Sequence, residues 1–219
     1  MTPAGPDDID AALFTPSPVV TNVYEELLEA VHRGDLLPGE RISDGELAKR
    51  YGVSRSPVRE ALQRLRDIGI IEASASRFTR VAVVTPVQTT QAYVVWLSLF
   101  ATLVEEVIES VPVETVELME HDMADFRAAF DPWQPERIAT ANFVFFSRLM
   151  ALTNNPILLR SMTGVVHVIR LGSLHLPATI DLEKLAGAHQ TLVDAAREHD
   201  LDKARVAVRA LRTISIPLD

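Results

Sequence analysis

Apolar residues recur at helical spacing near the start of the chain. Between positions 19 and 32 they occupy one face of a 3.6-residue period, at Val20, Val23, Tyr24, Leu27, Leu28 and Val31. Gly34 follows and favours the end of a helix. The pattern predicts an amphipathic helix over 19–32. Residues 1–18 hold four prolines and three aspartates with little periodicity, which indicates a mobile N-terminal arm.

Two short helices are predicted next. Ser43 stands three residues before Glu46, which is the spacing of a capping box, and it predicts a helix over about 44–51 that ends at Gly52. Ser54 is placed to cap a third helix that runs to about residue 68. Two β-rich runs, 70–73 and 80–84, flank a polar tip and predict a hairpin. Three helices and a hairpin within 19–84 are typical of a winged helix-turn-helix domain.

The second part of the chain has helical patterning throughout. Residues 87–216 show breaks near 112, 131–135, 154–156, 177 and 199–200, and no strand-type alternation. The fold class expected is therefore mainly α: an N-terminal winged helix-turn-helix domain, a linker over 85–90, and a C-terminal antiparallel all-α helical bundle over 91–216.

Composition narrows the function. The 219 residues carry a net charge of -9 and include no cysteine, which excludes disulfides, thiolate metal sites and cysteine nucleophiles. We find neither a run of about 20 uncharged apolar residues nor the basic and apolar regions of a secretion signal at the start. A cytoplasmic protein with no membrane partner is expected.

Local charge favours nucleic-acid binding in spite of the acidic total. The window 54–80 holds six arginines against three acidic residues, so its net charge is +3. In a helix-turn-helix, polar and basic residues at the start of the second helix enter the major groove. Ser54, Arg55, Ser56 and Arg59 occupy those outward positions. Because arginine pairs in bidentate fashion with guanine, Arg55 and Arg59 are the candidate base readers.

The segment LLPGERISDGELAKRYGVSRSPVREALQRLRDIGIIEA resembles the DNA-binding domain of the GntR family of bacterial transcription regulators. The resemblance implies DNA contacts from Arg55, Ser56 and Arg59, with Ser54 beside them, and from Arg77 and Thr79 in the wing. Two positions depart from the family pattern. Phe78 stands near the wing tip, where glycine is usual, and Gly45 stands where relatives often have a charged residue. The alternative is a winged helix that makes only protein contacts.

Two later segments, NFVFFSRLMALTNNPILL and AHQTLVDAAREHDLDKARVAV, resemble the FCD effector domains of the same regulators, which often hold a divalent metal. The alignment places Asn142, Phe146, His189 and Leu211 at the family's ligand positions. Phenylalanine and leucine offer no lone pair to a metal, so we expect no metal and no cofactor. The open alternative is that His167 or His175 rebuilds a site with His189.

The cavity between the bundle helices is then expected to bind a small organic effector. Trp96, Phe146 and Leu211 would make it apolar, and Asn142, Arg170 and His189 would be its polar anchors. The alternative is a cavity that has collapsed into core, which would leave a constitutive regulator.

The function predicted is a ligand-responsive repressor that binds a palindromic operator in double-stranded DNA as a homodimer. A helical interaction module without an effector is one alternative. Another is an enzyme built on the bundle, with Glu120-His121-Asp122 or Glu198-His199-Asp200 as its acid–base groups. Consecutive residues point in different directions around a helix, which argues against both triplets. We therefore expect no enzymatic activity.

Overall fold

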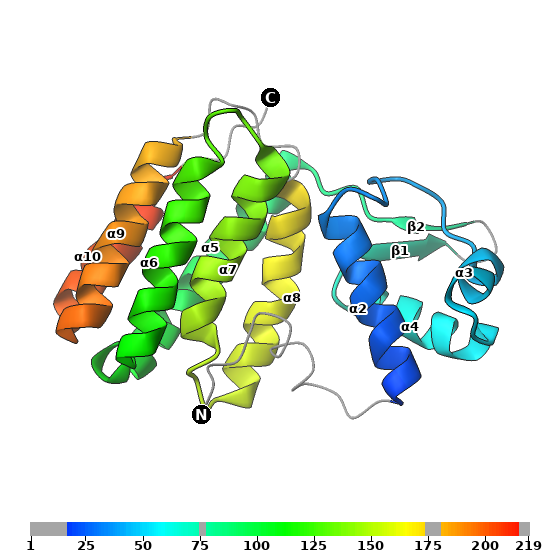
Figure 1. Cartoon of the computed structure of the whole chain (residues 1–219), viewed down its shortest axis with the longest axis horizontal. Helices are drawn as coiled ribbons and strands as arrows, with labels where there is room; N and C mark the ends of the chain where they lie inside the picture. Colours follow the sequence, from blue (N-terminus) through cyan, green and yellow to red (C-terminus); the bar gives the residue numbers. More distant parts are fainter. Residues whose placement is uncertain (1–16, 75–77, 174–180, 215–219) are drawn as a thin grey trace.

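A computed structural model of the chain describes residues 17–74, 78–173 and 181–214. These residues form a small N-terminal domain and a larger helical bundle that lie side by side (Figure 1). The predicted fold class is confirmed.

The small domain contains helices α2 (Pro18–His32), α3 (Asp44–Tyr51) and α4 (Arg55–Asp67) and strands β1 (Ile71–Ser74) and β2 (Phe78–Val81). The strands pair antiparallel, with Ile71 opposite Val81 and Ser74 opposite Phe78. The helix predicted over 19–32 begins one residue earlier, because proline is well suited to the first turn. The second strand begins at Phe78, two residues before the start of the run predicted over 80–84. The rest of the predicted arm lies outside the described residues.

The turn between α3 and α4 has the chemistry expected from the sequence. The Ser43 hydroxyl accepts a hydrogen bond from the Glu46 amide at 3.4 Å, which caps α3. Gly52 then ends α3 with a φ of 64°, a left-handed conformation that glycine adopts at little cost. Ser54 occupies the N-cap position of α4, but its side chain makes no capping hydrogen bond. That part of the expectation was wrong.

The bundle consists of α5 (Pro86–Val107), a 3-10 turn η1 (Ile108–Ser110), α6 (Val113–Ala128), α7 (Pro135–Met150), α8 (Pro156–Ser173), α9 (Leu182–Glu198) and α10 (Leu201–Leu211). Residues 86–90, predicted as linker, form the first turn of α5. The cause is a complete capping box. The Thr85 hydroxyl accepts a hydrogen bond from the backbone N–H of Gln88, and the Gln88 side-chain oxygen accepts one from the backbone N–H of Thr85. The expectation of a linker over 85–90 was therefore wrong for residues 86–90.

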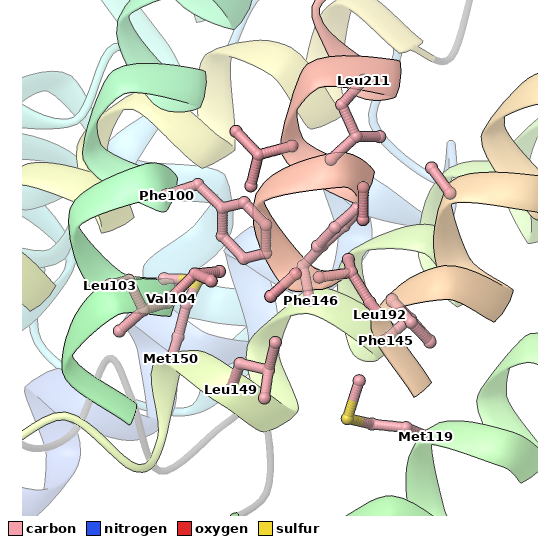
Figure 2. Close-up of a cluster of buried hydrophobic side chains, with 14 of the residues drawn as sticks. Phe100, Leu103, Val104, Met119, Phe145, Phe146, Leu149, Met150, Leu192 and Leu211 are labelled. Carbon is pink, nitrogen blue, oxygen red and sulfur yellow. The ribbon is translucent and has the colours of Figure 1, made fainter. Parts of the chain in front are cut away.

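Helix α5 packs against α7, α8 and α10 and supplies much of the bundle core. Phe100 and Leu103 of α5 lie with Phe146 of α7 and Leu211 of α10 in one apolar cluster (Figure 2). The span Pro86–Ser110 is long and apolar enough to cross a membrane by length and composition, a test that core helices of soluble proteins also pass. Its buried face is occupied by the bundle itself.

Helix α8 belongs to the bundle but also packs against the small domain. Leu171 near its C-terminal end is 1% exposed and belongs to the hydrophobic core of the small domain rather than to that of the bundle. One turn earlier, the His167 ring stacks on His32 of α2 with 5.6 Å between ring centroids. Helices α2 and α8 are adjacent in Figure 1. The small N-terminal domain is therefore in direct contact with a helix of the bundle.

Candidate DNA-binding surface and ligand cavity

The recognition helix α4 presents two distinct faces. Its apolar residues are buried against α2 and α3, at Val58, Ala61, Leu62 and Leu65. The predicted contact residues at its start are all exposed, at Ser54, Arg55, Ser56 and Arg59. Burial of the apolar face fixes the helix to the domain. The polar face stays exposed and could enter the major groove of DNA.

Arg59 is held by a residue of the preceding helix. Its Nε donates a hydrogen bond to Oδ2 of Asp44, in the first turn of α3, at 2.6 Å. This hydrogen bond keeps the pKa of Asp44 below its usual value. Sequence reasoning missed Asp44. The sequence shows only an acidic residue in the first turn of a helix. Such a residue is favourable there because of the helix dipole alone, so it does not indicate a partner.

Arg55 lies close to Gly45 of the same turn. A Cβ atom placed on Gly45 would be 3.1 Å from Nη2 of Arg55, which is tighter than ordinary contact. The unusual glycine noted in the sequence therefore provides the space that the Arg55 guanidinium occupies.

The wing is only partly described. Arg77 lies outside the described residues, whereas Thr79 lies in β2 and lines a surface groove with Asp44 and Arg59. Phe78, expected near the tip, is the first residue of β2 and pairs with Ser74, the last residue of β1. The Arg80 guanidinium lies 4.6 Å from the centroid of the Phe78 ring. It also pairs with Glu72 across the hairpin. Phe78 thus supports the wing's own structure.

In the bundle, five of the six predicted effector residues line one cavity of about 80 Å³. They are Trp96, Asn142, Phe146, Arg170 and Leu211. His189 is fully buried behind them. The cavity also has lining residues that sequence reasoning missed, namely Tyr93, Ala139, Phe143, Met150, Val166, Ile169, Ser173, Leu185 and Ile214. Helical periodicity marks most of these as apolar but does not tell cavity wall from core.

His189 is joined to the cavity through Asn142. The His189 Nε2 and Asn142 Oδ1 atoms are 3.0 Å apart. An amide oxygen can only accept, so Nε2 carries the proton. The imidazole stacks on Phe145 at 3.9 Å between centroids. Burial, with a smaller contribution from Arg127, lowers the pKa of His189 to about 3. The imidazole is therefore neutral at physiological pH.

These residues do not fit the metal that the FCD resemblance implies. Asn142 and His189 hydrogen-bond to each other, and Phe146 and Leu211 are buried at 4% and 0% exposure. Within the residues that the structure describes, no three His, Asp or Glu side chains are grouped so as to hold a metal ion. Two donors fall short of the three or four protein ligands usual in such sites.

The histidine proposed to rebuild the site lies elsewhere. His167 is 1% exposed and stacks on His32 of the small N-terminal domain. Sequence reasoning placed it on the correct helix but could not tell which face it occupied. His175 lies outside the described residues.

Arg170 and Phe143 separate two cavities. Both line the effector cavity, and both also line the cleft between the domains, together with His32 of α2. The Arg170 guanidinium stacks 4.5 Å from the Phe143 ring centroid and donates to the Thr140 hydroxyl at 3.3 Å. These contacts place a buried cation in the wall between this cavity and the cleft between the two domains.

The two acidic triplets considered for catalysis have structural partners. Asp122 forms a bidentate pair with Arg148, with nitrogen–oxygen distances of 2.7 and 3.1 Å, and Glu120 pairs with Arg197. In the second triplet, His199 ends α9 and the Asp200 carboxylate caps α10. Asp122 lines a cleft together with Glu136 and Arg137, but its carboxylate is already paired with Arg148, so the arrangement does not favour acid–base catalysis.

Each of the two domains matches a known protein family. The family described as "Bacterial regulatory proteins, gntR family" matches residues 20–81, and the FCD domain family matches residues 91–213. The HTH-type transcriptional regulator YdhC of Bacillus subtilis is 25% identical over 92% of this chain and 91% of its own length. Mce2R of Mycobacterium tuberculosis, also an HTH-type transcriptional regulator, is 41% identical over 64 residues, which are 29% of this chain and 27% of that protein.

Two solved structures share the fold of the whole chain. McbR/YncC of E. coli has a TM-score of 0.73 and 21% identity, over 90% of this chain and 95% of that one. A putative GntR transcriptional regulator of Rhodococcus sp. RHA1 has a TM-score of 0.71 and 21% identity, over 90% and 93%. With the two family matches, which together span most of the sequence, these findings show that the chain belongs to the gntR family of bacterial transcription regulators and carries an FCD effector-binding domain.

Proposed function

We propose that the protein is a cytoplasmic, ligand-responsive repressor that binds a palindromic operator as a homodimer and has no enzymatic activity. The observation that carries this proposal is the exposed set of polar residues at the start of α4, Ser54, Arg55, Ser56 and Arg59, above a buried apolar stripe. Repression is the simpler action, because a dimer seated on its operator excludes other proteins without contacting them.

A second copy of the chain is the expected partner of α5. The helix carries no charged residue between Pro86 and Val104, and its outer face exposes Val87, Val94 and Val95 at 50–56%. At 22 residues it is about 33 Å long, enough to support an interface of standard size along its length. Two-fold pairing would present two recognition helices to successive half-sites.

The effector is expected to be mainly apolar with one or two polar groups. The cavity walls are mostly hydrocarbon and aromatic, and their polar groups come from Trp96, Asn142 and Arg170 and from the hydroxyls of Tyr93 and Ser173. Within the described residues, the buried Trp96 indole N–H has no hydrogen-bond partner, and a ligand oxygen would satisfy it. A neutral Asn142 and His189 pair suits an uncharged group beside it.

The cavity is small for this role, which supports a second candidate function. Its volume of about 80 Å³ is well below the roughly 300–1,000 Å³ of ordinary ligand pockets. Either Phe143 and other side chains move on binding, or the protein is a constitutive regulator without an effector. Thermal-shift screening of full-length protein against a metabolite library separates the two, because only a ligand that binds the native state raises the melting temperature.

Helix α8 offers the route from cavity to DNA. Val166 and Ile169 line the cavity, His167 and Leu171 contact the DNA-binding domain, and Arg170 lies between them and lines both the cavity and the cleft between the domains. A ligand that displaces Arg170 or Phe143 would shift this helix against α2 and so alter the spacing of the two recognition helices.

The direct test of the proposed function is selection of duplex DNA from a random pool by the full-length protein, followed by sequencing. The proposal predicts enrichment of one two-fold symmetric sequence. Recovery of a pool with no enriched sequence would contradict it.

A further inference from the structure

The first turn of α3 contacts both candidate base-reading arginines of α4. Asp44 accepts the 2.6 Å hydrogen bond from Arg59, and a Cβ atom added to Gly45 would come within 3.1 Å of Nη2 of Arg55. Asp44 and Gly45 are adjacent in sequence, so one dipeptide controls the position of two side chains. Neither residue belongs to the apolar core that fixes α3 to α4, which is built from Leu47, Ala48, Val58 and Ala61.

The geometry of the Arg59 contact leaves its base-reading edge free. Asp44 uses the Nε–H of Arg59, and a guanidinium has four further N–H donors on its two terminal nitrogens. Those terminal nitrogens can pair with O6 and N7 of guanine. The Arg59 side chain is 65% exposed in spite of the ion pair, so the carboxylate restrains the arginine without covering it.

A carboxylate on this surface also has an electrostatic consequence. Asp44 repels DNA phosphates, and phosphate attraction supplies most of the affinity for random sequence. An arginine held in one rotamer loses less side-chain freedom on binding its base than a mobile one. Both effects act in the same direction: they weaken binding to random DNA relative to binding to the operator.

We propose that Asp44 and Gly45 are specificity-determining positioning residues, which hold Arg59 and Arg55 in the orientation that reads operator bases. This inference rests on the proposed DNA-binding function and adds to it the residues that set sequence selectivity. Gly45 acts by leaving room for Arg55, and Asp44 acts by bonding Arg59.

The test compares full-length variants on two duplexes, the sequence selected by the wild-type protein and a scrambled duplex of the same composition. Asp44→Asn keeps the size of the side chain and removes its charge. We expect about a tenfold loss of affinity for the selected duplex, within the range of one disturbed arginine–guanine pair, and unchanged or tighter binding to the scrambled one. Asp44→Glu, which keeps the carboxylate, is expected to retain part of the selectivity.

Glu46→Gln is the matched control. It removes the same charge from the first turn of the same helix. The net charge and the interaction of side-chain charge with the helix dipole therefore change by similar amounts in the two variants. We expect its selectivity to stay within about twofold of wild type, as for surface substitutions away from such contacts.

Gly45→Ala gives an independent arm. Alanine favours a helix more than glycine does, so the melting temperature is expected to stay equal or rise while selectivity falls, because the new methyl displaces Arg55. A purely structural role for this turn would not separate stability from selectivity.

The outcomes distinguish this inference from the function on which it rests. If wild-type protein selects no sequence, the DNA-binding proposal fails. If wild-type protein is selective but Asp44→Asn and Gly45→Ala are as selective as wild type, or lose affinity equally on both duplexes, then the positioning role is overturned.

Discussion

At the scale of single residues, the side chains proposed to contact DNA are exposed and those proposed to form the effector site are buried. Arg55 is exposed at the start of α4, where its guanidinium can reach a base edge. His189 is fully buried and bonded to Asn142. The first is expected to affect binding and the second stability.

Arg55→Ala is expected to weaken binding to the selected duplex by about 1–3 kcal/mol, the range for a guanine-reading arginine. Binding to scrambled DNA should change much less. Fluorescence anisotropy on both duplexes measures the difference. Arg33→Ala is the control, because Arg33 follows α2, lies outside the helix pair α3 and α4, and pairs with Glu29 and Asp35. Equal losses on the two duplexes would make Arg55 a phosphate contact.

His189 predicts an acid-sensitive fold. Its pKa is about 3 in the native state and about 6.5 in the unfolded chain. Below pH 6.5 the unfolded state therefore binds a proton that the native state does not, so stability is full above pH 6.5 and falls as pH drops toward 3. The slope from this residue is about 1.4 kcal/mol per pH unit. Urea denaturation of wild type and His189→Leu between pH 7.5 and 5 should show the shallower dependence in the variant. Parallel curves would refute the assignment.

At the scale of elements, the sequence predicts helices well and interfaces poorly. The spans of α2, α3 and α4 follow from apolar spacing, the Ser43 cap and Gly52, all of which act within a few residues. Residues 86–90 were misjudged as linker because Pro86 can both end a segment and begin a helix. The partners of Asp44, His167 and Leu171 depend on how helices pack, which no local pattern records.

Leu171 gives the clearest consequence of this packing. It lies on a bundle helix but is 1% exposed in the core of the DNA-binding domain, so Leu171→Ala is expected to cost about 2–5 kcal/mol in the unfolding of that domain. Hydrogen exchange of amides in α2 and α4 measures the loss. Ile157→Ala, on the same helix at 67% exposure, is the control. Unchanged protection in α2 and α4 would show that the domains are not coupled through α8.

The four ligand positions of the bundle form a second element-scale case. Because Phe146 and Leu211 fill the apolar cluster and Asn142 bonds His189, protein purified without chelator is expected to carry less than one tenth of an equivalent of zinc, nickel or manganese, as a rough threshold for a site with too few donors. Elemental analysis measures this. One tightly held equivalent that is lost in His189→Ala would contradict the interpretation.

At the scale of the whole molecule, an acidic protein is expected to bind DNA through one small domain and to pair through the other. Val94→Glu places a charge on the exposed apolar face of α5 and should convert a dimer to a monomer in light scattering, because an unpaired charge in an interface is costly to desolvate. Val113→Glu, at 68% exposure near the start of α6, is the control and should remain dimeric. A Val94→Glu protein that stays dimeric would place the interface elsewhere.

The measurement that tests the central claim most directly is the affinity of the full-length protein for its selected duplex and for a scrambled duplex at the same physiological salt. The proposed function predicts that two chains bind each selected duplex, at least about 10³-fold more tightly than they bind the scrambled one. Equal affinity for the two duplexes would contradict the claim that this protein reads a DNA sequence.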